Sequence, residues 1–326
     1  MGRISDDVKN RTFSPVYLIY GEEAYLKDNY RKSLIKALVS PGDNLNYSFF
    51  SGGGTDPGEV LSLAQTLPFM AEKRVVQVID SGFFKKSDDD IVDYLEKPSP
   101  DTVLLFVESE VDKRGRAFKA ASKAGYVVEA AKYDAKKLPQ WVAAGFKRYD
   151  KKVKRETVDL LIDRVGTDMT ALDMEIAKLS SYAGDRDIVT SEDVTELVSR
   201  SPAFNVFQMI DAIADRRLNR AVGIYYDMLA EKESPFGILA LMERHYRGLL
   251  VVKDMNERKA DPAEIAKGAG IPAFAVSKYG TQARKYSRGR LIKVLDSCVK
   301  ADRDIKQGNM DPGIAVELLI VDTASE

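Results

Sequence analysis

The order of apolar and polar residues predicts two differently built parts of the chain. Up to about residue 130, short runs rich in β-branched and aromatic residues alternate with segments of helical length. The predicted strands are 16–20, 47–50, 75–79, 103–107 and 126–129, and the predicted helices lie near 23–38, 57–66, 88–96 and 113–124. Asp56 and Asp112 are expected to be N-caps. This alternation predicts an α/β domain with a mostly parallel sheet and helices on both faces.

Beyond Trp141 the strand signals end and helical spacing takes over. A capping box, Thr190 with Asp193, precedes one predicted helix, and apolar stripes recur within 172–179, 206–213, 239–250 and 291–305. The stretch 315–321 is apolar nearly all round, so we expect it to be buried in this chain or at an interface. We therefore predict an α/β domain at 1–140, a small helical lid-type domain at 141–210 and a larger helical domain at 211–326.

Composition indicates an ordinary soluble globular protein. The 326 residues are 44% hydrophobic and 30% charged, and the formal net charge is −1. Such a balance gives no global attraction to nucleic acid or membrane, so any DNA contact needs a local patch. No apolar run approaches the roughly 18 to 20 residues of a membrane span. Residues 1–7 lack the apolar core of a signal peptide, and the cytoplasm is the expected location.

Cysteine and histidine each occur once, which excludes an internal disulfide and a Cys/His zinc cluster. Cys298 lies in a helical stripe with Leu291 and Leu295, where a buried thiol is expected rather than a nucleophile. His245 has no acid–serine constellation beside it in the sequence. We expect a surface or helix-packing imidazole.

The first predicted strand ends at Gly21-Glu22-Glu23, where a nucleotide-binding domain would carry its phosphate cradle. A P-loop needs G-x-x-x-x-G-K-[ST], and two glutamates would repel phosphates. Asp80 stands where a Walker-B acid would, but Ser81 follows it instead of a second carboxylate. The glycine-rich 51–55 segment has no following Lys and is read as a turn. We expect a degenerate nucleotide site, with no catalytic, cofactor-binding or metal-binding residues.

This three-part layout resembles that of an AAA+ protein of the clamp-loader kind, and several segments point to a more specific resemblance. They are YLIYGEEAYL at 17–26, LPFMAEKRVV at 67–76, DKR at 112–114, Trp141, Val165-Gly166 with Asp168-Met169, the Leu172, Glu175, Lys178, Leu179 set, EDV at 192–194, and Asp302 with Ile305-Lys306. In this order they resemble the delta subunit family of bacterial DNA polymerase III. Ala24, Lys27 and Met70 depart from residues frequent in that family.

The resemblance implies a non-catalytic subunit of the replicative clamp loader, within a DNA-directed DNA polymerase holoenzyme, a nucleotidyltransferase complex. Such a subunit binds the sliding clamp, the beta subunit, and opens it for loading onto primed DNA. Its C-terminal domain would join a helical collar with the gamma/tau and delta prime subunits, in which ATP would act. Contact with primer–template DNA would come through the assembled complex, and no membrane partner is implied.

The resemblance places the clamp-binding element at Leu67, Pro68, Phe69 and Met70, with Phe69 and Met70 as the inserted hydrophobic pair. The other interpretation is that this pair caps the core of the sheet. Two rival functions stay open: an AAA+ ATPase or other phosphate-binding enzyme with an irregular P-loop, and a helical scaffold unrelated to replication.

Arginine and lysine clusters leave further alternatives. Arg200, between two serines, could be an arginine finger, although it follows a helix of the small domain. The basic runs 113–119 and 147–155 could approach DNA phosphates or could be solvated helix faces.

Overall fold

The computed structural model describes residues 3–134, 136–272 and 275–325. The chain divides into two compact units, residues 1–132 and 133–326, and each is considered by itself. The second unit contains both predicted helical domains. The predicted domain edges at 140 and 210 fall within helices α6 (Lys137–Lys147) and α10 (Pro202–Ala214).

The first unit is built on a five-stranded parallel sheet. Its strands are β1 (Val16–Tyr20), β2 (Tyr47–Ser51), β3 (Arg74–Ile79), β4 (Thr102–Glu108) and β5 (Tyr126–Glu129), in the order β2-β3-β4-β1-β5. Leu18 of β1 pairs with Phe106 of β4 and Val127 of β5. Every residue of β1 and β4 is buried, as expected for central parallel strands covered on both faces. All five predicted strands are confirmed.

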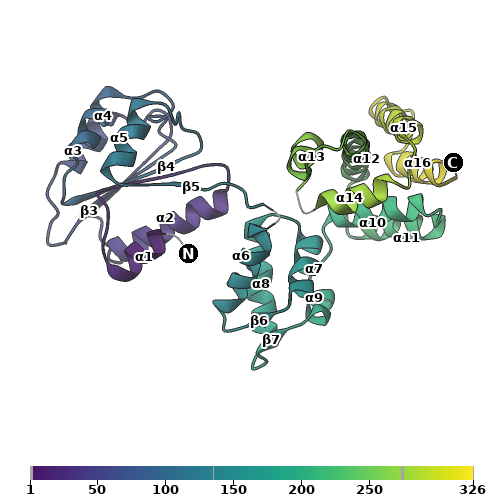
Figure 1. Ribbon diagram of the computed structural model, residues 1–326, viewed down its shortest axis with the longest axis horizontal. Helices are drawn as coiled ribbons and strands as arrows, with labels where there is room; N and C mark the ends of the chain where they lie inside the picture. Colours follow the sequence, from purple (N-terminus) through teal and green to yellow (C-terminus); the bar gives the residue numbers. More distant parts are fainter. Residues whose placement is uncertain (1–2, 135, 273–274, 326) are drawn as a thin grey trace. The chain divides into compact units, whose positions relative to one another are not determined.

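Helices cover both faces of this sheet (Figure 1). One face carries α1 (Arg3–Asn10) and α2 (Ala24–Leu38), and the other carries α3 (Pro57–Ala64), α4 (Asp89–Glu96) and α5 (Arg116–Ala124). Alternate residues of β1 serve the two sides: Val16, Leu18 and Tyr20 pack with α3 to α5, and Tyr17 and Ile19 pack on the α1 and α2 side. The sequence pattern did not predict α1.

One of the two predicted N-caps is wrong. Asp56 caps α3 by accepting a hydrogen bond from the Gly58 amide, as predicted. Asp112 instead accepts from the Arg114 amide in the turn before α5, whose N-cap position is Gly115. The Ala117 amide at the start of α5 donates to the Ser87 hydroxyl, 3.2 Å away. A side chain from an earlier segment therefore replaces the local cap.

The second unit opens with a small helical group: α6, α7 (Arg155–Val165), α8 (Met169–Ala183) and α9 (Ser191–Leu197). The Thr190–Asp193 capping box at the start of α9 is confirmed. The expectation that no strands follow Trp141 is wrong. Two-residue strands β6 (Lys152–Val153) and β7 (Ile188–Val189) pair in parallel beside these helices, and they are too short to give a sequence signal.

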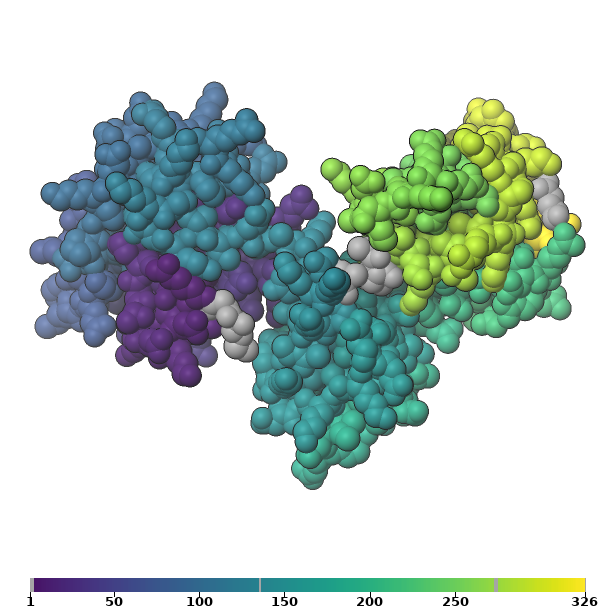
Figure 2. All heavy atoms as spheres, in the orientation of Figure 1, coloured from purple at the N-terminus to yellow at the C-terminus, as the bar shows by residue number. Residues whose placement is uncertain are grey.

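The larger helical group follows. Its helices are α10, α11 (Leu218–Ala230), α12 (Pro235–Glu257), α13 (Pro262–Ala269), α14 (Val276–Ala283), α15 (Arg288–Lys306) and α16 (Pro312–Ser325). The green and yellow atoms in Figure 2 show α12 to α16 packed as a dense block. Within 315–321, Ala315, Val316, Leu319 and Ile320 are buried in the core of this group, whereas Leu318 is exposed.

The predicted fold class, a parallel α/β domain followed by helical regions, is confirmed. Among the described residues, no helix combines the length and the apolar character needed to cross a membrane.

Candidate functional site

The connection between β1 and α2 is only three residues long, Gly21 to Glu23. The Gly21 amide donates to the Glu108 carbonyl at 3.2 Å, and the Glu23 amide donates to the Ala130 carbonyl at 2.9 Å. Gly21 has a φ of +130°, and a Cβ at this position would lie 2.5 Å from the Ala130 oxygen. Glycine is therefore required for close approach to the chain after β5, and two amides of this connection already have protein partners.

A carboxylate occupies the N-terminus of α2, the end of a helix that attracts anions. The Glu23 side chain caps the helix by accepting from the Tyr25 amide at 3.4 Å. Glu22 is exposed beside it, with its carboxylate 3.7 Å from the Lys132 ammonium. The N-terminus of α2 thus does not fit the phosphates of a nucleotide, because it holds negative side chains.

Two carboxylates at the carboxyl ends of β3 and β4 accept hydrogen bonds from backbone amides of the neighbouring strand end. Asp80 accepts from the Ser109 amide at 2.7 Å, and Glu108 accepts from the amides of Ser81 and Gly82 at 3.1 and 3.3 Å. Burial raises the pKa of Glu108 above its usual value, although these hydrogen bonds oppose the shift. Each carboxylate thus ties its own strand end to the neighbouring one.

This use of Asp80 differs from that of a Walker-B acid. No group of three or more His, Cys, Asp or Glu suited to a metal ion occurs among the described residues. The sequence did not indicate this role of Glu108. The residue ends a largely apolar strand, and its partners Ser81 and Gly82 are 27 and 26 residues away in the sequence.

A second feature of the first unit is the apolar loop, residues Leu67 to Met70, between α3 and β3. Three of its side chains are largely exposed: Leu67 by 71%, Phe69 by 61% and Met70 by 94%. The interpretation that Phe69 and Met70 cap the core of the sheet is therefore wrong. Exposed large apolar side chains grouped in one short segment are typical of interaction sites.

Asn46, next to the start of β2, holds the middle of the apolar loop. Its Oδ1 accepts from the Phe69 amide at 2.7 Å, and its Nδ2 donates to the Phe69 carbonyl at 2.9 Å. Asp43 holds Asn46 in turn, accepting from its Nδ2 and from its backbone amide, both at 2.9 Å. Hydrogen bonds from Asn46 lower the pKa of the Asp43 carboxyl.

Arg74, the first residue of β3, holds the start of the loop. Its buried guanidinium donates from Nε to the Thr66 carbonyl at 3.1 Å and from Nη2 to the Leu67 carbonyl at 3.4 Å. The Ala64 carbonyl, just before these residues, accepts from the Thr102 hydroxyl at 2.7 Å. The loop backbone is thus fixed to the sheet while its apolar side chains face outward.

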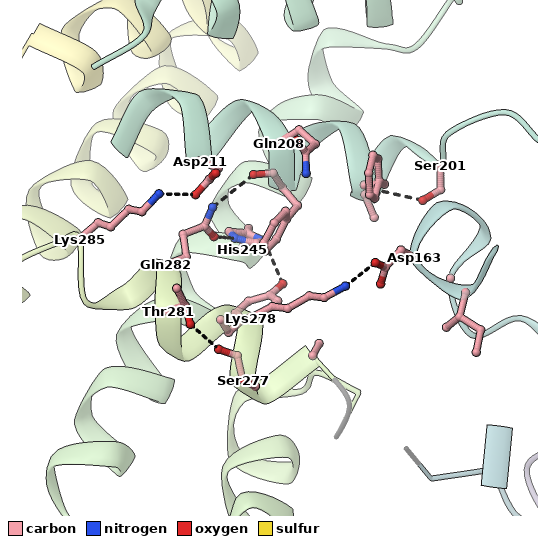
Figure 3. Close-up of a pocket in the computed structure, with 17 residues that line it drawn as sticks. Asp163, Ser201, Gln208, Asp211, His245, Ser277, Lys278, Thr281, Gln282 and Lys285 are labelled. Carbon is pink, nitrogen blue, oxygen red and sulfur yellow. Dashed lines mark hydrogen bonds and ion pairs between the residues drawn. The ribbon is translucent and has the colours of Figure 1, made fainter. Parts of the chain in front are cut away.

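The second unit has a pocket of about 500 Å³ between α7, α10, α12 and α14 (Figure 3). His245 is buried beside it: its Nε2 donates to the Gln282 Oε1 at 2.5 Å, and its Nδ1 accepts from the Tyr279 hydroxyl at 2.9 Å. Burial lowers the pKa of His245 to about 4. Lys278 forms an ion pair with Asp163 at the pocket (Figure 3). Both ring nitrogens of the histidine have structural partners, which confirms the helix-packing interpretation.

The other singled-out side chains also make internal contacts. Cys298 is buried, which confirms the expected buried thiol, and burial raises its pKa to about 12. The Arg200 guanidinium lies 5.9 Å from the centre of the Phe204 ring. In the basic runs, Lys113 pairs with Glu129 at 2.9 Å. Arginines of the same runs also form ion pairs: Arg116 with Asp89, Arg148 with Asp173, and Arg155 with Asp159. These pairs favour solvated helix faces over a phosphate-binding surface.

Two parts of the chain match models of known protein families. Residues 17–131 match the model of the DNA polymerase III delta subunit, and residues 203–323 match the model of the C-terminal domain of that subunit. The chain belongs to the DNA polymerase III delta subunit family. The first of these matches contains both the short β1–α2 connection and the apolar loop.

Individual delta relatives match along nearly the whole chain. The DNA polymerase III subunit delta of Bacillus subtilis is 28% identical, with 96% of this chain and 94% of the relative covered. The probable DNA polymerase III subunit delta of Aquifex aeolicus is 22% identical, with 88% and 85% covered. The solved structure of the Bacillus subtilis DNA clamp loader delta protein has a TM-score of 0.78 and 27% identity, and 99% of each chain is covered.

Proposed function

We propose that this delta-family chain is the subunit of a replicative clamp loader that binds the sliding clamp, the beta subunit, and opens it for loading onto primed DNA. The observation that carries the proposal is the apolar loop, whose side chains are exposed while hydrogen bonds from Asn46 and Arg74 fix its backbone. Phe69 and Met70 are the anchors, and Leu67 and Pro68 complete the contact. A rigid loop loses little conformational freedom on binding, which favours affinity.

Opening of the clamp ring would follow from binding of this subunit alone. A subunit that binds the open form of a ring more tightly than the closed form shifts the equilibrium by that difference in affinity. The chain itself would have no enzymatic activity and would take no nucleotide, since Glu23 caps α2 and Asp80 holds Ser109. ATP would act in the sibling subunits of the complex.

Sibling contact is assigned to residues 211–326, as part of a helical collar with the gamma/tau and delta prime subunits. Exposed apolar side chains on α15 and α16 support this assignment: Ile292, Val299, Ile314 and Leu318. Primer–template DNA would be reached through the assembled complex, in the bacterial cytoplasm.

The deciding experiment replaces both anchors with alanine and measures the dissociation constant for the beta clamp. Burying each side chain contributes roughly 1.5 to 3 kcal/mol, and each 1.4 kcal/mol corresponds to about tenfold in affinity. We expect at least about 100-fold weaker binding, with the melting temperature nearly unchanged because both side chains are exposed in the free protein. Met174→Ala is the matched control, since Met174 is 69% exposed on α8 and outside the loop. Unchanged affinity in the folded double variant would refute the proposal.

The rival function, an AAA+ ATPase, is tested separately by calorimetric titration with ATP and magnesium. We expect no saturable heat at micromolar nucleotide. A saturable isotherm would contradict this expectation and favour the ATPase.

A further inference from the structure

We infer that Asn46 is a positioning residue for clamp binding, which holds Phe69 in the conformation that presents the apolar loop to its partner. The inference rests on the proposed function and adds a residue that lies 23 positions before Phe69 in the sequence. It concerns a side chain that is only 5% exposed, so Asn46 acts through Phe69 and not by touching the clamp.

The carboxamide of Asn46 satisfies both backbone groups of Phe69, in the way a neighbouring strand would. Its oxygen accepts the Phe69 amide proton at 2.7 Å and its nitrogen donates to the Phe69 carbonyl at 2.9 Å. A primary amide carries its acceptor and its donor on two separate atoms and can therefore bond both backbone groups at once, whereas a carboxylate only accepts. Asparagine at this position therefore matches the backbone of the loop at two points.

Hydrogen bonds to β3 and to Asp43 hold Asn46 in place. Its carbonyl accepts from the Val75 amide of β3 at 2.8 Å, which fixes the backbone to the sheet. Asp43 accepts from the Nδ2 of Asn46 at 2.9 Å, and this contact orients the carboxamide with its oxygen toward the Phe69 amide. The path from the sheet to the loop is thus a continuous set of hydrogen bonds.

The loop needs such support because its conformation is unfavourable by itself. Met70 has a φ of +52°, in the left-handed region that non-glycine residues seldom adopt. Exposed Phe69 and Met70 side chains would also gain by folding back onto the protein, away from water. Without the two hydrogen bonds of Asn46, we expect the loop to populate conformations that do not present both anchors.

The test is a mutant cycle on the full chain with the beta clamp as the probe. Asn46→Ala, Phe69→Ala with Met70→Ala, and the triple variant are compared with the parent. We expect Asn46→Ala to weaken binding about tenfold, the equivalent of 1.4 kcal/mol, and to add less than about twofold in the Phe69/Met70 variant. Asn44→Ala is the matched control, an exposed asparagine two positions away that should leave affinity unchanged.

A second measurement reads the loop without the clamp. Because the Phe69 amide donates to Asn46, its hydrogen exchange should become faster in Asn46→Ala and stay at the parent rate in Asn44→Ala. If Asn46→Ala does not fold, Asn46→Ser is used, since serine is small and lacks the paired donor and acceptor geometry.

The outcomes separate the two claims. Native affinity of the folded Phe69/Met70 variant overturns the proposed function and, with it, the positioning role. Weak binding of that variant, together with native affinity of Asn46→Ala, overturns only the inference. An equal loss on mutating Asn46 in both backgrounds also overturns it, because the effect would then not pass through the anchors.

Discussion

Lowering the pH from 7 to 5 should destabilise the second unit through its buried imidazole. His245 has a pKa of about 4 in the folded chain against 6.5 for an exposed histidine, because burial disfavours the charged form. Its neutral form therefore contributes stability that is fully present above pH 6.5 and is lost as the pH falls from 6.5 toward 4. Integrated between pH 7 and pH 5, this loss is about 2 kcal/mol of unfolding free energy.

The measurement is urea unfolding at both pH values for the parent and for His245→Gln, which cannot take up a proton. Asp211, whose charge favours protonation of the imidazole, is present in both proteins. The difference between the two pH dependences therefore isolates the histidine.

A direct reading comes from NMR, because the chain has one histidine and its imidazole signal needs no assignment. We expect a titration midpoint near 4. A midpoint near 6.5, or a His245→Gln variant with the same pH dependence as the parent, would refute the burial argument.

Three further predictions concern burial and backbone approach. Cys298 should not react with a thiol reagent at pH 8 in the folded protein and should react fully in denaturant, since its pKa is about 12; rapid native labelling would contradict this. Gly125→Ala should cost on the order of 3 kcal/mol or more, because its methyl would lie 1.9 Å from the Val16 carbonyl oxygen; chemical denaturation measures it. Gly223→Ala, inside α11 with open space around the added methyl, should instead stabilise by about 0.5 to 1 kcal/mol; a lower melting temperature would be the contrary result.

The sheet was predictable chiefly because its central strands β1 and β4 are buried on both faces. A run such as Val16 to Tyr20 is continuously apolar or aromatic, and β1 has those bounds. The cap of α5 was not predictable, because its acceptor is Ser87, 30 residues from Ala117. β6 and β7 were not predictable, because a two-residue strand is too short to show an alternation of apolar and polar residues.

The candidate site was predictable in part. Resemblance singled out Leu67 to Met70 as a candidate, but composition could not decide whether Phe69 and Met70 were core or surface, since an apolar run suits either. What settles their exposure is the set of polar contacts beneath them, above all those of Asn46 with Phe69. The partners of such contacts are distant in sequence, and no local pattern indicates them.

The three-residue link between Tyr20 and Ala24 also bears on how this protein can change over generations. A phosphate cradle there would need an insertion, and added residues would draw the amides of Gly21 and Glu23 away from the ends of β4 and β5. Each partial insertion would lose those bonds before any affinity for nucleotide was gained. Asp80 would in addition have to release Ser109. Lengthening this connection would therefore cost hydrogen bonds at the ends of β4 and β5, and stability with them, before it could gain affinity for phosphates.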